Sequence, residues 1–292
     1  MAVDERWLLG DIEDDLRAAP ARRVMYLEGR TDPKMFFALV GERLPAVSPR
    51  QGGYVCQDIL VRGLSSEKGS GSLPVRQRVD VASKHRGLLG KVFGIIDGDG
   101  RSLSEQLAAP SSPAKPLFRW PTYCIENQLV MAGWPPAWGT CPDWLTEVQA
   151  LAPYVAVNRL LVRLQRALEP LNFPRHLRPN FDQPLHDVTH IEAVLRDGRE
   201  HIAGYEINGY RQEVAFVQAT LARDAEEMHA LVNGKWLVQW AAKRQGLSEE
   251  MCRTVWCTHV ATLGGGAEAA NLWRRVSAYD AVQRETADDT VR

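Results

Sequence analysis

The stretch "VMYLEGRTDPKMFF", residues 24–37, joins a short apolar run to a second apolar pattern through an acid, a glycine, an aspartate and a proline. Residues 22–27 predict a buried strand that stops at Glu28. Residues 32–44 predict a helix, with Asp32 as its N-cap and Pro33 as its first residue. A carboxylate at the end of a buried strand therefore needs an explanation, because an uncompensated charge is costly in such a place.

The same alternation of strand and helix continues through the first half of the chain. Strands are predicted at 53–63, 91–97 and 117–122, with helices at 74–90 and 124–131. This order favours an α/β fold with a parallel sheet flanked by crossover helices. From about residue 140 the apolar spacing is mostly helical. We therefore expect an α/β catalytic domain over 1–140 and a helical C-terminal region over 141–292.

Four acids follow the predicted strands: Glu28, Asp97, Asp99 and Glu126. The carboxyl ends of parallel strands meet at one edge of a sheet, where ligands collect. If the chain stays extended at Asp97–Asp99, both aspartates point to the same side. Carboxylates gathered in this way repel one another, and Mg²⁺ relieves that repulsion because it prefers oxygen ligands. A turn with no metal role remains the alternative for this Asp-Gly-Asp-Gly segment.

These motifs resemble the TOPRIM domain. "YLEGRTD", residues 26–32, and "FGIIDGDG", residues 93–100, resemble its strand-end glutamate and its later Asp-x-Asp pair. "YCIENQL", residues 123–129, and "NGKWLV", residues 233–238, are similar to segments of the OLD-like (overcoming lysogenization defect) nucleases. Within that group, the chain is most similar to compact TOPRIM effectors of anti-phage defence, including the effector subunit of PARIS-type systems.

The resemblance implies a Rossmann-like TOPRIM sheet and a nuclease that cuts RNA or DNA with Mg²⁺ or Mn²⁺, using two ions. It assigns metal binding to five acids. It assigns catalysis to all of these acids except Asp32 and to Lys235, which would approach the scissile phosphate. The acids are Glu28, Asp32, Asp97, Asp99 and Glu126. One departure is that 61–72 lacks the glycine-rich strand end that many relatives carry.

The resemblance also implies partners. Family members often work with an ABC-type ATPase, and this chain has no G-x-x-x-x-G-K-[ST] phosphate loop. The glycine-rich segment 263–273 lacks the lysine and favours a turn. We therefore expect a separate ATPase that controls a toxic effector, and a homodimer. A catalytically silent TOPRIM-fold subunit that binds nucleic acid or a partner is the alternative.

The composition sets the remaining expectations. The chain has 292 residues, a net charge of −1 and five cysteines without framework spacing, which favour a cytoplasmic protein with free thiols. It has no run of about 18 apolar residues, so we expect no membrane span.

Basic and aromatic clusters are candidates for nucleic-acid contacts. Residues 62–91 hold seven Lys or Arg against two acids, and a solvated face is the alternative. The members assigned to nucleic acid are Arg76, Arg78, Lys84 and Arg86. A second cluster of arginines lies within 159–178. Trp134, Trp138 and Trp144 are expected to pack in the core, with base stacking and partner binding as alternatives.

Zinc chemistry is the competing reading of two other segments. His186 and His190 stand at i and i+4, but the intervening acid is an aspartate and no third ligand is evident. A surface helix is therefore expected there. The spacing of Cys252, Cys257 and His259 fits no common zinc module, so we expect buried thiols.

Overall fold

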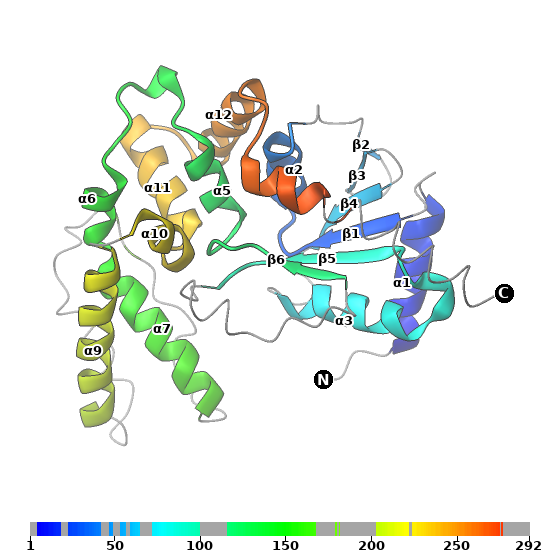
Figure 1. The fold of residues 1–292 in the computed structure, drawn as a ribbon, viewed down its shortest axis with the longest axis horizontal. Helices are drawn as coiled ribbons and strands as arrows, with labels where there is room; N and C mark the ends of the chain where they lie inside the picture. The colour runs from blue at the N-terminus through cyan, green and yellow to red at the C-terminus, as the bar shows by residue number, and fades with distance from the viewer. Residues whose placement is uncertain are drawn as a thin grey trace.

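The first half of the chain forms a six-stranded, mostly parallel sheet flanked by helices, and the second half is mostly helical (Figure 1). This α/β arrangement confirms the predicted fold class. The computed structural model describes residues 5–18, 23–41, 47–48, 53–56, 59–64, 72–99, 116–167, 179, 181, 203–221, 224–274 and 276. Within these ranges, no helix is long and apolar enough to span a membrane.

The strands have the order β2-β3-β4-β1-β5-β6, and all run in one direction except β3. The two strands that carry predicted site residues, β1 and β5, are hydrogen-bonded neighbours near the middle of the sheet. The strands are β1 Arg23–Leu27, β2 Val47–Ser48, β3 Gly53–Cys56, β4 Ile59–Gly63, β5 Val92–Ile96 and β6 Leu117–Arg119.

The prediction of one strand over 53–63 is wrong. The segment forms two strands, β3 and β4, that pair antiparallel with Tyr54 opposite Val61. A continuous strand would leave one edge of β4 unpaired, whereas the reversal lets β3 supply its hydrogen bonds. The sheet is therefore mixed at this edge and parallel from β4 to β6.

Alternate residues of β1 face two different cores. Val24 and Tyr26 pack with α1 (Glu5–Ala18) and α3 (Ser72–Lys84) on one face of the sheet. Met25 and Leu27 pack in the larger core on the other face, together with residues of α2 (Asp32–Leu39). This two-residue period places β1 between two helical layers, which explains why all five of its residues are buried.

The start of α2 differs from the sequence prediction. Thr31, not Asp32, occupies the N-cap position, and it makes no side-chain capping bond. The Asp32 carboxylate instead accepts a hydrogen bond from the backbone N–H of Gly29, with 2.8 Å between Oδ2 and N. A side chain at Gly29 would overlap this carboxylate. The short aspartate is therefore held against the turn that follows β1.

The second half of the chain contributes to the same large core as α2 and α5 (Ile125–Ala132). Helix α12 (Glu249–Thr262) packs against α2, and α11 (Gly234–Gln245) packs against α5. Gly266 donates from its backbone N–H to the carbonyl of Leu39 at the end of α2, so the glycine-rich segment at 263–266 is a turn, as expected. Other helices in the described part of the chain are α6 Trp144–Gln149, α7 Ala152–Ala167, α9 Ala203–Leu221, α10 Ala225–Leu231 and a helical segment at 267–274, with short 3₁₀ turns η2 Arg86–Leu88 and η3 Pro136–Trp138.

The predicted tryptophan cluster packs in this core. Trp134 lies edge-to-face against Trp138, Trp144 and Trp256, with ring centroids 5.0–5.7 Å apart. Trp240 completes the group from α11. The indole N–H of Trp256, which is fully buried, donates to the carbonyl of Gly133 at 2.6 Å. Of the three roles considered, the packing supports the core role.

Trp256 is therefore the residue at which this core is most easily tested. We expect Trp256→Ala to lower the free energy of unfolding by about 3–5 kcal/mol, since it removes a fully buried ring and leaves a cavity. Met251→Ala, on the exposed side of the same helix, should change it by less than about 0.5 kcal/mol. Urea denaturation measures both values, and similar small losses in the two variants would contradict this account of the core.

Candidate active site

Two of the predicted acids are joined directly at the carboxyl ends of β1 and β5. Glu28 follows β1 and Asp97 follows β5, and these strands are parallel neighbours. The backbone N–H of Asp97 donates to Oε1 of Glu28 at 2.9 Å. The sheet register therefore brings two acids that are far apart in sequence to one edge, as the strand-end argument predicted.

The Asp97–Asp99 segment turns rather than staying extended. Asp99 has a φ of 58°, a left-handed conformation that aspartate tolerates better than most residues. The backbone N–H groups of Gly98 and Asp99 both donate to the carbonyl of Tyr123, at 2.9 and 3.1 Å. A side chain at Gly98 would overlap the carbonyl of Thr122. The extended backbone that would point both carboxylates to one side is therefore not formed. Asp97 is buried, whereas Asp99 is exposed.

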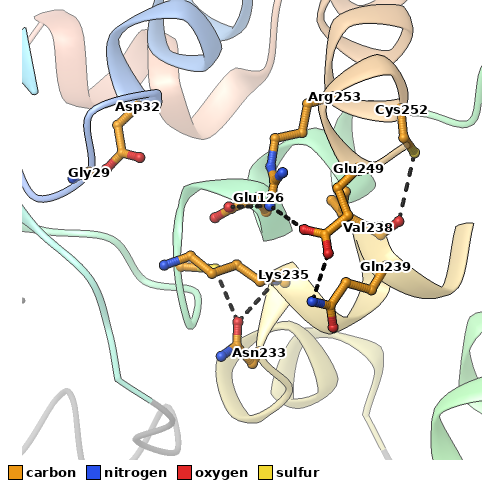
Figure 2. Close-up of polar contacts among 12 residues, drawn as sticks. Gly29, Asp32, Glu126, Asn233, Lys235, Val238, Gln239, Glu249, Cys252 and Arg253 are labelled. Atoms are coloured by element: carbon orange, nitrogen blue, oxygen red, sulfur yellow. Dashed lines mark hydrogen bonds and ion pairs between the residues drawn. The ribbon is translucent and has the colours of Figure 1, made fainter. Parts of the chain in front are cut away.

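Asp32 and Glu126 reach the same region from two helices. Asp32 begins α2 and is 7% exposed, and Glu126 lies in the first turn of α5 and is 2% exposed. Oε1 of Glu126 lies 3.5 Å from Nη2 of Arg253 on α12 (Figure 2). Oε2 of Glu126 is buried and has no hydrogen-bond partner among the described residues. A carboxylate so placed lacks a cation or a donor on one side.

The pKa shifts show that the acids lie within one another's electric field. Burial, followed by the charges of Asp99 and Asp32, raises the pKa of Glu28 to about 7. Burial and then Glu126 raise the pKa of Asp32 to about 6. Burial, Glu28 and Asp32 raise the pKa of Asp97 well above its ordinary value. The cluster therefore gathers more negative charge than a buried edge stabilises.

Lys235 brings a positive charge to this cluster from the start of α11. Partial burial works to lower its pKa, but Glu126, Cys124 and Asp97 outweigh that effect and hold the pKa above its ordinary value. Figure 2 shows its side chain extending below Glu126 toward the side on which Asp32 lies. Asn233 caps the helix by accepting from the backbone N–H of Lys235 at 3.0 Å.

Asn127 holds α5 and the start of α11 together. Its Oδ1 accepts from the backbone N–H groups of Cys124 and Gly234, at 3.0 and 3.1 Å. Its Nδ2 donates to the carbonyl of Val232 at 2.9 Å. One fully buried amide thus fixes Glu126 and Lys235 relative to each other, although more than one hundred residues separate them. Sequence reasoning missed Asn127, which stands beside Glu126 in an otherwise ordinary helix start.

Arg119 is a second residue that the sequence reasoning missed. It comes from β6, and its guanidinium donates to the backbone carbonyl of Asp97 at 2.8 Å. This bond fixes the backbone at the end of β5 from the neighbouring strand. Its only sequence signal is a basic residue inside the short strand predicted over 117–122, two residues before a proline.

The donor set fits a hard divalent cation in its chemistry. Every acid supplies carboxylate oxygen, and the buried Oε2 of Glu126 has no hydrogen-bond partner in the described part of the chain. In the described ranges, no three His, Cys, Asp or Glu side chains converge closely enough to form a complete cage as they stand. Mg²⁺ does not need such a cage, because it is commonly held by one or two carboxylates together with water and substrate phosphates.

Several of the described basic residues of 62–91 are already paired with acids of α1. Arg78 is buried, pairs with Asp11 and stacks on the ring of Tyr26. Lys84 is exposed, and its Nζ lies 3.2 Å from Oε2 of Glu5. Arg76 is half-buried and donates to Ser72, whereas Arg86 is exposed. Their assignment to nucleic acid stays a prediction, and the pairing favours Arg76 and Arg86 over Arg78.

The other candidate segments are only partly described. In the second arginine cluster, Arg159 is half-buried and pairs with Glu213 at 3.1 Å. Burial raises the pKa of both Cys252 and Cys257 to about 12. Cys252 is fully buried, as expected, whereas Cys257 is only half-buried. The His186–His190 segment, the loop at 65–71 and residues 175 and 178 lie outside the described residues.

No protein-family model, curated protein or solved structure matches this chain. The arrangement of the acids and of Lys235, together with the motif resemblance, is therefore what supports a function.

The burial and crowding of the acids have a measurable consequence for stability. The pKa of Glu28 rises from about 4.5 to about 7 on folding, so its charged form disfavours the folded state. The penalty is absent below about pH 4.5 and fully present above about pH 7. We expect Glu28→Gln, which still accepts the N–H of Asp97, to raise the free energy of unfolding at pH 8 by on the order of 1–3 kcal/mol.

The same gain should shrink toward zero as the pH is lowered to 5. Urea denaturation at the two pH values, without divalent ions, measures it. Glu250→Gln, which removes an exposed acid of α12, serves as the matched control and should show no such pH dependence. If the free energies of unfolding of wild type and Glu28→Gln differ by the same amount at both pH values, the charge of Glu28 does not destabilise the folded state.

Proposed function

We propose that this protein is a metal-dependent nuclease of the TOPRIM type that hydrolyses phosphodiester bonds in RNA or DNA. The observation that carries the proposal is the convergence of Glu28, Asp32, Asp97 and Glu126 at one edge of the sheet, with the ammonium of Lys235 beside them. Mutually repelling acids next to a lysine provide binding for cations and for the anionic phosphate that accompanies them.

The motif resemblance supports the same reaction. It matches Glu28 and the Asp97–Asp99 pair to the metal-binding acids of OLD-like nucleases, and it matches Lys235 to a lysine near the scissile phosphate. The last two motifs, at 123–129 and 233–238, are short, but Asn127 and Gly234 hydrogen-bond across them. Their proximity gives each weak motif support that it lacks alone.

Each side chain of the site has a separate role in the proposal. Asp97, Asp32 and Glu126, with the half-buried Glu28 and the exposed Asp99, would hold Mg²⁺ or Mn²⁺. Such ions supply Lewis acidity, which activates water and neutralises charge on phosphate. Lys235 binds a phosphate oxygen with its ammonium group. The resemblance matches Glu28 to a metal ligand or a general base, so it would either hold an ion or take a proton from the attacking water.

A catalytically silent binding subunit is the second candidate. The observation that favours it is the ion pair between Glu126 and Arg253, which already balances one acid of the cluster. A site whose charge is balanced internally binds a partner or a nucleic acid without needing a metal. The two candidates differ in one result, which is whether phosphodiester bonds are cut in the presence of a divalent ion.

Control by a separate ABC-type ATPase, action as a toxic effector in anti-phage defence, and a homodimeric state rest on the resemblance. Co-expression with neighbouring open reading frames, followed by affinity purification and mass measurement, tests the ATPase and the dimer together. If the bare chain is an active, harmless monomer that retains no ATPase, this part of the proposal fails and the nuclease assignment remains.

The nuclease assignment predicts a defined pattern of cleavage. We expect plasmid DNA or total RNA to be cut with Mg²⁺ or Mn²⁺ and to stay intact with EDTA. Asp97→Asn should reduce the initial rate by at least about 100-fold, because it removes charge from the buried centre of the cluster. Gel analysis of time courses measures these rates.

The control is again Glu250→Gln, whose acid is exposed on α12 outside the cluster. It should cut at the wild-type rate. Cleavage that persists in EDTA, or at full rate in folded Asp97→Asn, would exclude a metal-dependent reaction at this edge of the sheet.

A further inference from the structure

Arg253 joins the candidate site from α12, which sequence reasoning left out of the site. Its Nη2 lies 3.5 Å from Oε1 of Glu126 and 3.3 Å from Oε2 of Glu249, one turn earlier on the same helix. Gln239 donates to the other oxygen of Glu249 at 2.9 Å. Figure 2 shows this chain of contacts, which fixes the guanidinium at one end.

Two polar atoms of this ion pair have no partner in the described part of the chain. Oε2 of Glu126 and Nε of Arg253 are both buried, and neither has a hydrogen-bond partner among the described residues. Their needs are opposite: the carboxylate oxygen requires a cation or a donor, and the Nε–H requires an acceptor. Buried groups of this kind are rarely left unsatisfied, so the pair indicates a missing ligand.

The charge around Arg253 indicates what that ligand is. Burial and Glu126 raise the pKa of Asp32, while the N–H of Gly29, Lys235 and Arg253 oppose them. The positive charge of Arg253 therefore acts on Asp32 as well as on Glu126, which it contacts. A divalent ion with a phosphate group satisfies both atoms at once, because the ion meets Glu126 and a phosphate oxygen meets Nε. A planar guanidinium held at one end is well suited to this second contact.

We propose that Arg253 is a phosphate-binding residue of this site, which donates from Nε to a non-bridging oxygen of the substrate phosphodiester when an ion occupies Glu126. The inference rests on the proposed nuclease function and adds a residue that the motif resemblance does not assign. Glu249 and Gln239 position the guanidinium, whereas Arg253 itself contacts the substrate. Lys235 and Arg253 then approach the phosphate from α11 and α12.

Binding separates this role from a purely structural one. The probes are a short fluorescein-labelled single-stranded RNA and the DNA of the same sequence, and fluorescence anisotropy measures their affinity across a salt series. Ca²⁺ replaces Mg²⁺, and gels confirm that the probe stays intact. We expect Arg253→Gln to weaken binding about tenfold and to reduce the slope of log affinity against log salt by about one.

Two further variants make the result interpretable. Arg244→Gln on α11 is the matched control, because Arg244 is exposed and its guanidinium pairs with Glu147 and stacks on Trp240. It should leave affinity and slope unchanged. Arg253→Lys keeps a charge opposite Glu126, so it should fold even if Arg253→Gln does not. It should retain the slope but bind several-fold more weakly, because the planar fork is lost.

The outcomes distinguish the two proposals. If wild type binds and cuts a probe, but Arg253→Gln or Arg253→Lys binds it with unchanged affinity, Arg253 only balances Glu126 and this inference is overturned alone. If wild type binds neither probe at any salt concentration, the proposed function falls and this inference with it. The RNA and DNA probes show which nucleic acid the site binds more tightly. The proposal requires Arg253→Gln to lose affinity for that nucleic acid.

Discussion

The burial and mutual repulsion of a few carboxylates are the constraint on which the candidate site depends. Glu28, Asp32 and Asp97 all have raised pKa values because they are removed from water and face one another. This arrangement destabilises the folded state unless a cation is present. Lys235 and Arg253 supply positive charge from the second half of the chain, but each is a single monovalent group. A divalent ion would remove the remaining imbalance.

The fold holds these charges close by devices that are unrelated to charge. The parallel register of β1 and β5 aligns Glu28 with the backbone of Asp97. Gly98 admits the close approach of the chain at Thr122, and Asn127 fixes α5 against α11. Packing of α11 on α5 and of α12 on α2 then carries Lys235 and Arg253 to the sheet edge. The helical half is thus part of the site's framework.

Strand-end logic predicted the sheet and the gathering of Glu28 with Asp97, because the end of a parallel strand fixes where the next residue lies. It did not predict the β3–β4 reversal, since an apolar run of strand residues is also compatible with one long strand. Asp32 was misassigned as a helix cap because capping chemistry and the turn bond to Gly29 use the same residue type. Arg253 was missed because its partner Glu126 is 127 positions away, a distance that no local pattern encodes.

The stabilising effect of Mg²⁺ is the measurement that bears on the repelling acids without depending on any substrate. Thermal unfolding is followed at pH 8 with increasing Mg²⁺ for wild type, Asp97→Asn and Glu250→Gln. A site of this kind predicts that wild type and Glu250→Gln gain stability together, by about 2.7 kcal/mol when Mg²⁺ reaches 100 times its dissociation constant, while Asp97→Asn gains little. A wild-type protein whose stability does not respond to Mg²⁺ or Mn²⁺ would contradict the account.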